Sequence, residues 1–198
     1  MALSPEFNRF CQDWRQKANA YRTDDTRQCF DKFFTPYVLF NRLYAEATFT
    51  LARRRPILQR RIARATGFPD PQAATSSYLI EYLTARTLVL AIAANQEANN
   101  ALEAVKGFIR AHTFYIRLDK VTGNRRPAED DRLLVASVES RSANEKATAI
   151  LETIYQVRCN MFHGHKGFQP VQRDLLRPII ILLETVINVT DQKLRAEP

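Results

Sequence analysis

The stretch that decides the fold reads NEKATAILETIYQVRCNMFHGHKG and covers residues 144–167. In its first half, apolar side chains return at steps of three and four residues, which is the pattern of an amphipathic helix. Ser142 stands where an N-cap is expected, and Glu145 follows three positions later, as in a capping box. Gly164 and Gly167 are candidate stop signals. We therefore expect a helix that begins near residue 144 and ends ahead of these glycines.

The end of this helix carries a dense group of polar side chains. Arg158, Asn160, His163 and His165 lie within eight positions of one another. Asn160 and His163 are three apart and share a face of a helix, whereas Arg158 and His163 are five apart and point about 140° away from each other. Arg158 and His163 therefore converge only if the helix ends near Asn160, or if a second copy of the chain completes the site.

The rest of the chain also predicts helices. With 198 residues, 45% hydrophobic and 25% charged, the chain is long enough to bury a core, and the scarcity of glycine favours an α protein. We expect a single all-α domain over residues 1–198, with a short extended or hairpin insertion around 113–127. The other predicted helices cover about 5–20, 26–54, 56–67, 73–95, 101–111 and 128–141, with a final helix that starts at Asp174.

Two of these helices have features of their own. The helix over 26–54 contains Pro36, which should kink or divide it because proline removes a hydrogen bond and crowds the preceding turn. Its many aromatic side chains recur at helical spacing, which favours a bundle core over base stacking. Asn41 lies among them and needs a polar partner if it is buried, so we place it near the Arg158 site. The helix over 73–95 is the most apolar, and we expect it to be central.

The chain is basic, with a net charge of +8 and a pI near 9.7, so an acidic polymer such as RNA is a reasonable partner. The strongest local concentration of charge lies between residues 53 and 64. These arginines can hold phosphates, although a solvated helix face explains them equally well. The candidate RNA-binding residues are Arg54, Arg55, Arg60, Arg61, Arg64 and Lys166.

Three stretches resemble one known family. Residues 158–164, RCNMFHG, are similar to the Arg-x4-His motif of HEPN domains, in which a polar residue follows the arginine and glycine follows the histidine. Residues 34–44, FTPYVLFNRLY, resemble a helix found upstream in many such proteins, and Asp174 opens an apolar helix as the family pattern expects. The resemblance is spread over the whole chain as separate landmarks, of which the short motif is the diagnostic one.

The resemblance implies an antiparallel helical bundle, usually a homodimer, in which many members are metal-independent RNA endonucleases. They serve in toxin–antitoxin, phage-defence or RNA-processing systems, so an antitoxin or defence-system partner is implied as well. Carried over to this chain, Arg158 and His163 are catalytic and Asn160 supports them. A toxin subfamily has tyrosine two residues after the histidine, and this chain has His165 there. That departure points away from the subfamily and its tyrosine-modifying antitoxin.

Cysteine spacing and hydropathy limit other functions. Cys11, Cys29 and Cys159 are odd in number and form no paired metal motif, so we expect free thiols and neither a metal nor a cofactor. No apolar run reaches the roughly 18–20 residues that span a bilayer, and the first residues lack the pattern of a signal peptide. We therefore expect a cytoplasmic protein without membrane contact.

The expected chemistry is RNA cleavage by the neighbouring 2′-hydroxyl. Histidine suits the two proton transfers because its pKa lies near neutrality, and Arg158 can stabilise the phosphorane. Two His163 side chains of a dimer can supply acid and base, with His165 as the alternative within one chain. A non-catalytic RNA- or nucleotide-binding or protein-interaction module stays open, as does a purely structural helical protein. A terminal arginine, asparagine and histidine can also simply cap a helix.

Overall fold

A computed structural model describes residues 3–64, 71–119, 122, 124–162 and 169–197. The all-α class is confirmed: among the described residues the pairing of extended backbone is limited to one antiparallel bridge between Leu118 and Arg125. The elements in chain order are α1 (Pro5–Asn19), α2 (Thr26–Arg53), α3 (Pro56–Arg64), α4 (Pro71–Ala73), the π-helix η1 (Ala74–Tyr78), α5 (Leu79–Leu83), α6 (Ala85–Ala94), α7 (Gln96–Arg110), α8 (Ala128–Glu139), α9 (Ala143–Phe162) and α10 (Pro170–Ala196).

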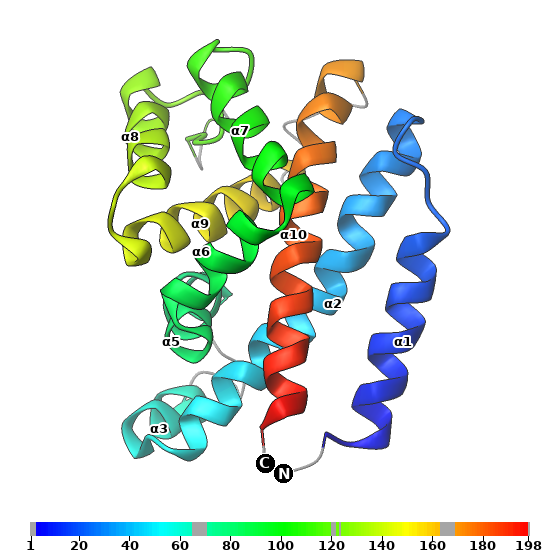
Figure 1. The fold of residues 1–198 in the computed structure, drawn as a ribbon, viewed down its shortest axis with the longest axis vertical. Helices are drawn as coiled ribbons and strands as arrows, with labels where there is room; N and C mark the ends of the chain where they lie inside the picture. Colours follow the sequence, from blue (N-terminus) through cyan, green and yellow to red (C-terminus); the bar gives the residue numbers. More distant parts are fainter. Residues whose placement is uncertain (1–2, 65–70, 120–121, 123, 163–168, 198) are drawn as a thin grey trace.

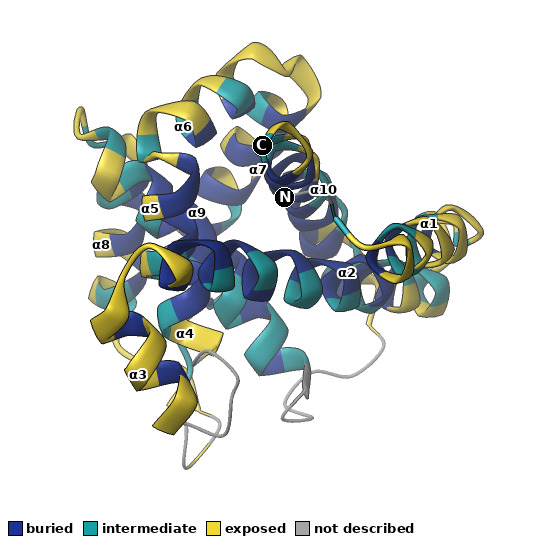
Figure 2. Ribbon diagram, turned by 90° about the horizontal axis from the view of Figure 1, so that it is seen from below, coloured by how far each residue is buried: buried dark blue, intermediate teal, exposed yellow. Residues whose placement is uncertain are grey.

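Helix α10 lies at the centre of the bundle, with α2 and α7 packed along it, and α1 covers the outer side of α2 (Figure 1). Helices α6 and α8 both pack on α9 at the other side of the molecule. The predicted apolar face of α10 is buried along its whole length, and Ile179, Leu183 and Val186 are fully enclosed. Viewed from below, buried residues face the inside of the bundle, while α3 is largely exposed (Figure 2).

Capping side chains mark several helix starts, and the predicted cap of α9 is confirmed, because the Ser142 hydroxyl accepts a hydrogen bond from the amide of Glu145 at 3.3 Å. Ser4 accepts a hydrogen bond from the amide of Phe7 at the start of α1, and Asp25 accepts one from Gln28 at the start of α2. Pro36 does not divide α2, which continues as one helix of 28 residues. The last helix begins earlier than predicted, at Pro170, because proline is well suited to the first helical position.

The prediction of one central helix over 73–95 is wrong. The segment turns by 85° between Pro71–Leu83 and Ala85–Ala94. The break falls at Thr84, whose φ of 67° ends one helix, while its hydroxyl caps the next by accepting from the amide of Thr87. Helix α6 lies at the surface, where Leu90 is 55% exposed. Tertiary packing on α9 therefore overrides the apolar pattern, and α10 takes the central position.

The membrane prediction bears on this same segment. In the part of the chain that the structure describes, no single helix is long and apolar enough to cross a membrane. The bent pair on either side of Thr84 reaches that length and composition only when its two parts are taken together.

The insertion around 113–127 is extended, as predicted, and it is fixed to the bundle at its base. The amides of Ile116 and Arg117 each donate to the carboxylate of Asp131 in α8, both at 3.0 Å. Arg117 forms an ion pair with Glu152 in α9 at 2.8 Å. Ile116 itself is fully buried. Asp131, in the acidic first turn of α8, therefore has two roles. Its charge is favourable at the positive helix terminus, and its carboxylate holds the insertion against α8.

Candidate functional site

Arg158 lies near the end of α9, half-buried against α2. Its guanidinium carbon is 5.7 Å from the centroid of the Tyr37 ring, which is a cation–π distance. Its Nη1 atom is 3.9 Å from the sulfur of Cys159. Burial raises the pKa of Tyr37, so the ring stays a neutral phenol beside the cation. These contacts place the Arg158 guanidinium over Tyr37 and beside Cys159, in a residue that is half-buried as a whole.

Asn160 is buried, and its amide has a structural partner. Its Nδ2 atom donates to the carbonyl oxygen of Ile116 at 2.8 Å. This bond joins the end of α9 to the insertion that Asp131 holds from the other side. Asn160 therefore positions the turn of helix that carries Arg158, and this contact is what a buried amide requires.

The course of α9 decides how Arg158 and His163 can meet. The helix continues through Phe162, so it does not end near Asn160. The helix end near Asn160 that convergence within one chain would need is therefore not observed, and a site completed by another copy of the chain stays a prediction. His163, His165 and Lys166 lie outside the described residues.

Asn41 lies one helical turn beyond Tyr37 on α2, on the same side of that helix. It is half-buried, and its placement near the Arg158 site stays a prediction. The other aromatic side chains of α2 behave as predicted for a bundle core. Phe33 and Phe40 are fully buried and stack edge-on against their neighbours along the helix.

The predicted RNA-binding arginines divide into two groups. Arg54, Arg55 and Arg61 line one cavity of ≈ 620 Å³ at the far end of α2, together with the phenol of Tyr78. Arg60 and Arg64 are exposed on α3 and do not line that cavity. The arginine cluster therefore lies far along the chain from Tyr37, the residue of α2 that contacts Arg158. Only three of its arginines line the cavity.

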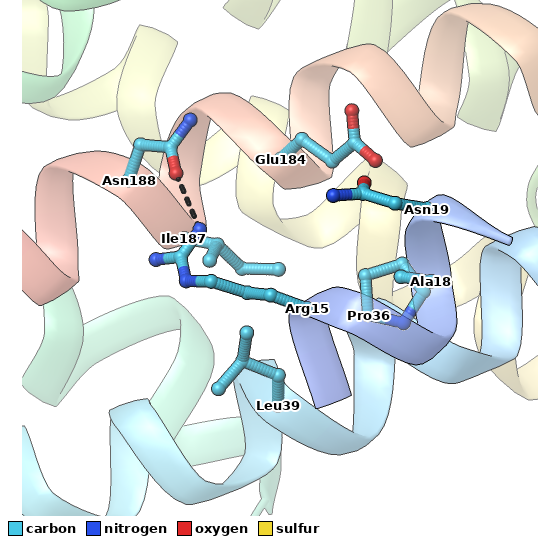
Figure 3. Close-up of a pocket in the computed structure, with 8 residues that line it drawn as sticks. All are labelled: Arg15, Ala18, Asn19, Pro36, Leu39, Glu184, Ile187 and Asn188. Atoms are coloured by element: carbon cyan, nitrogen blue, oxygen red, sulfur yellow. Dashed lines mark hydrogen bonds between the residues drawn. The ribbon is translucent and has the colours of Figure 1, made fainter. Parts of the chain in front are cut away.

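A smaller cavity of ≈ 180 Å³ lies between α1, α2 and α10 (Figure 3). Arg15 reaches across it and donates to the side-chain oxygen of Asn188 at 2.9 Å and to Asp191 at 3.1 Å. On its rim, Glu184 forms an ion pair with Lys32 at 3.2 Å. The polar groups of this cavity join α10 to α1 and to α2, and none of the predicted site residues lines it.

The cysteines are free thiols, as predicted. Cys11 and Cys29 are buried, and burial raises the pKa of each to about 11. Cys159 is only half-buried, beside Arg158. Among the described residues no group of three or more histidine, cysteine, aspartate or glutamate side chains is placed to hold a metal ion.

Comparison with protein-family models, with curated proteins and with solved structures gives no match to this chain.

Sequence reasoning did not find the partners that fix the site. Tyr37 was predicted only as a core aromatic, and its position four residues before Asn41 was the available signal that both face the same neighbour. The bond from Asn160 to Ile116 joins residues 44 positions apart, and no local pattern indicates it. Tyr78 likewise reaches the arginine cluster only through the fold.

Asn160→Ala should destabilise the protein by about 1–3 kcal/mol, because the buried carbonyl of Ile116 loses its donor. Chemical unfolding measures this change. Asn144→Ala is the matched control, since Asn144 is exposed on the same helix and should change stability by less than about 0.5 kcal/mol. Equal effects of the two substitutions would contradict the structural role of Asn160.

Cys159 should react with iodoacetamide at least about tenfold faster than Cys11 or Cys29, because the thiolate is the reactive form and burial suppresses it in the other two. Peptide mass spectrometry over a time course follows each thiol. Cys159→Ser should remove the fast phase. A comparably fast reaction at Cys11 or Cys29 would show that their helices open locally and would refute the ranking.

Proposed function

We propose that this protein is a metal-independent RNA endonuclease of the HEPN type that acts as a homodimer. The observation that carries the proposal is the fixed, half-buried guanidinium of Arg158, stacked on Tyr37 in the Arg-x4-His context. A cation held in place before the reaction stabilises the charge that develops on a phosphorane without reorganising. The net charge of +8 adds a general attraction for RNA.

In this proposal the reaction runs by attack of a 2′-hydroxyl on the adjacent phosphate. One His163 takes the proton of the hydroxyl, and His163 of the partner subunit protonates the leaving 5′-oxygen. The products are a 2′,3′-cyclic phosphate and a free 5′-hydroxyl. Arg158 binds the phosphoryl oxygens with its forked donors. His165 is the alternative second proton carrier within one chain, and Asn41 lies on the same side of α2 as the ring beneath Arg158.

Asn160 has a positioning role in this proposal. Its amide donates to Ile116, which holds the turn that carries Arg158. The length of α9 supports the dimeric arrangement, because a helix that runs on to Phe162 does not end near Asn160, where convergence within one chain would need it to end. A toxin–antitoxin, phage-defence or RNA-processing system is the setting in which we place the activity, with an antitoxin or defence protein as regulatory partner.

The wild-type protein should cleave a labelled structured RNA in excess EDTA and leave cyclic phosphate ends. His163→Ala and Arg158→Ala should each lower the rate by at least about 100-fold, the size of effect that loss of an acid–base group or a charge-stabilising donor has. Gel analysis of product ends measures this. Arg132→Ala removes a charge from an exposed position on α8 and should leave the rate within about twofold of wild type.

Unchanged cleavage by His163→Ala would remove this mechanism. Binding of the RNA by the wild-type protein without any cleavage would replace it with the non-catalytic binding module, which the groove lined by Arg54, Arg55 and Arg61 favours as second candidate.

The shared site predicts that a mixed dimer loses most of its activity. A heterodimer of one wild-type and one His163→Ala subunit, purified through two different tags, should cleave RNA at least about 100-fold more slowly than the wild-type dimer, because the reaction needs one His163 as base and the other as acid. A heterodimer with half of the wild-type rate, or a wild-type protein that sediments as a monomer while it cleaves RNA, would contradict a site built from two subunits.

A further inference from the structure

A second hollow lies between α3 and the η1–α5 segment, away from Arg158. It has a volume of ≈ 620 Å³, within the range of small-molecule and cofactor sites. Three arginines, one tyrosine, one glutamate and a short apolar strip surround it: Arg54, Arg55, Pro56, Ile57, Leu58, Arg61, Tyr78 and Glu81. We call it the Tyr78 groove. No motif identified in the sequence includes Tyr78.

The apolar part of the Tyr78 groove is unusually open to solvent. Ile57 is 78% exposed, although its neighbour Leu58 is buried. Tyr78 ends the π-helix η1 and is half-exposed, and π turns recur at functional sites in proteins. An aromatic face beside an exposed isoleucine forms a platform on which a flat ring can stack.

The charged part of the groove surrounds this platform. Arg61 Nη1 donates to the Tyr78 hydroxyl at 3.3 Å, which holds a guanidinium beside the phenol ring. Arg55 meets Glu81 at 2.6 Å, and both side chains are substantially exposed. Exposed ion pairs of this kind contribute little stability, so a phosphate can replace the carboxylate and gain a bidentate contact.

Arg54 meets Glu197 at 2.6 Å in the same way. The three lining arginines carry three positive charges, and Glu81 and Glu197 together carry two negative charges, which leaves an excess of one positive charge. Glu81 and Glu197 each place a carboxylate oxygen against an arginine, and a phosphate oxygen can take the same position. The groove therefore combines a surface for a ring with an excess of donors for an anion.

We propose that the Tyr78 groove binds one nucleotide, with its base stacked on Tyr78 and Ile57 and its phosphate on Arg55 and Arg61. The nucleotide is a free one or a unit of an RNA strand. The RNA form rests on the proposed function, because it takes RNA as the substrate. The groove itself is a separate site, and it binds without the chemistry of Arg158.

The position of the groove sets a length for the RNA form. Seventeen positions separate Tyr37, beneath Arg158, from Arg54, the C-cap residue of α2, at the groove. At about 1.5 Å per residue this is about 25 Å along the helix. A stacked strand rises about 3.4 Å per nucleotide, so roughly seven nucleotides cover the distance. RNA that touches both places must be longer than that.

Fluorescence anisotropy tests the proposal with three probes: labelled AMP, a labelled 4-nucleotide RNA and a labelled 16-nucleotide RNA. The host is the full chain with Arg158→Ala in EDTA, so that cleavage does not interfere. Tyr78→Ala should weaken binding of at least one probe by about tenfold, since it removes a stacking surface. Tyr78→Phe keeps the ring and should retain most of the affinity.

Arg61→Ala and Arg60→Ala form the matched pair, because both remove one charge from α3 and only Arg61 lines the groove. Arg61→Ala should weaken binding at least about fivefold more than Arg60→Ala, because a positioned contact adds to the general charge. Loss with AMP identifies a free nucleotide as the ligand, and loss with RNA alone identifies the strand. Equal effects of the two arginines, or full affinity of Tyr78→Ala for every probe, would overturn the proposal.

The two proposals fail separately. Tyr78-dependent binding by a protein that never cleaves RNA would leave the groove standing and remove the nuclease. Normal cleavage together with unaltered affinity in Tyr78→Ala would do the reverse.

Discussion

The structure depends on the burial of one helix face that is too wide for a single neighbour to cover. Residues of α10 from Leu175 to Leu194 turn apolar side chains both toward α2 and toward α7, and Ile179, Leu183 and Val186 are fully enclosed. Each such side chain stabilises the fold by roughly 1.5–3 kcal/mol when it leaves water. The helices on either side of α10 are therefore fixed relative to each other through it.

Both candidate sites lie along helix α2, the longest described helix, which packs on α10. Tyr37 lies in its middle and supports the guanidinium of Arg158, while Arg54 stands at its end beside the Tyr78 groove. The buried aromatic side chains between these points leave α2 little freedom to bend there. A single rigid element thus sets the separation of a proposed catalytic arginine and a proposed nucleotide site.

The parts of this structure that local chemistry determines could be predicted from the sequence. Ser142 caps the helix that it was expected to cap, and the final helix, expected to be apolar, has a buried apolar face. The break at Thr84 could not be predicted, because a threonine with positive φ has no sequence signature and the flanking residues are good helix formers. The central helix was predicted wrongly for a related reason. The apolar content of a helix does not determine how many other helices pack around it.

The sequence predicted only part of the candidate site. The residues that it indicated lie close together in the chain, and the residues that it missed lie far from their partners. Arg158 and Asn160 stand out within a short motif, whereas what holds them, Tyr37 and Ile116, comes from remote segments. Such contacts depend on how helices are arranged, which periodicity does not encode. The same holds for Arg61 and Tyr78, which lie on separate helices.

The fastening of Ile116 also limits how this chain can vary in length. Its amide is held by α8, its carbonyl by α9, and its side chain is enclosed by the core. Adding or deleting a residue between α7 and Ile116 would shift all three attachments and move the turn of α9 that carries Arg158. Beyond the bridge between Leu118 and Arg125, a change of length would leave these attachments in place. Homologous chains should therefore accommodate insertions at the tip of this segment and conserve its length at the base.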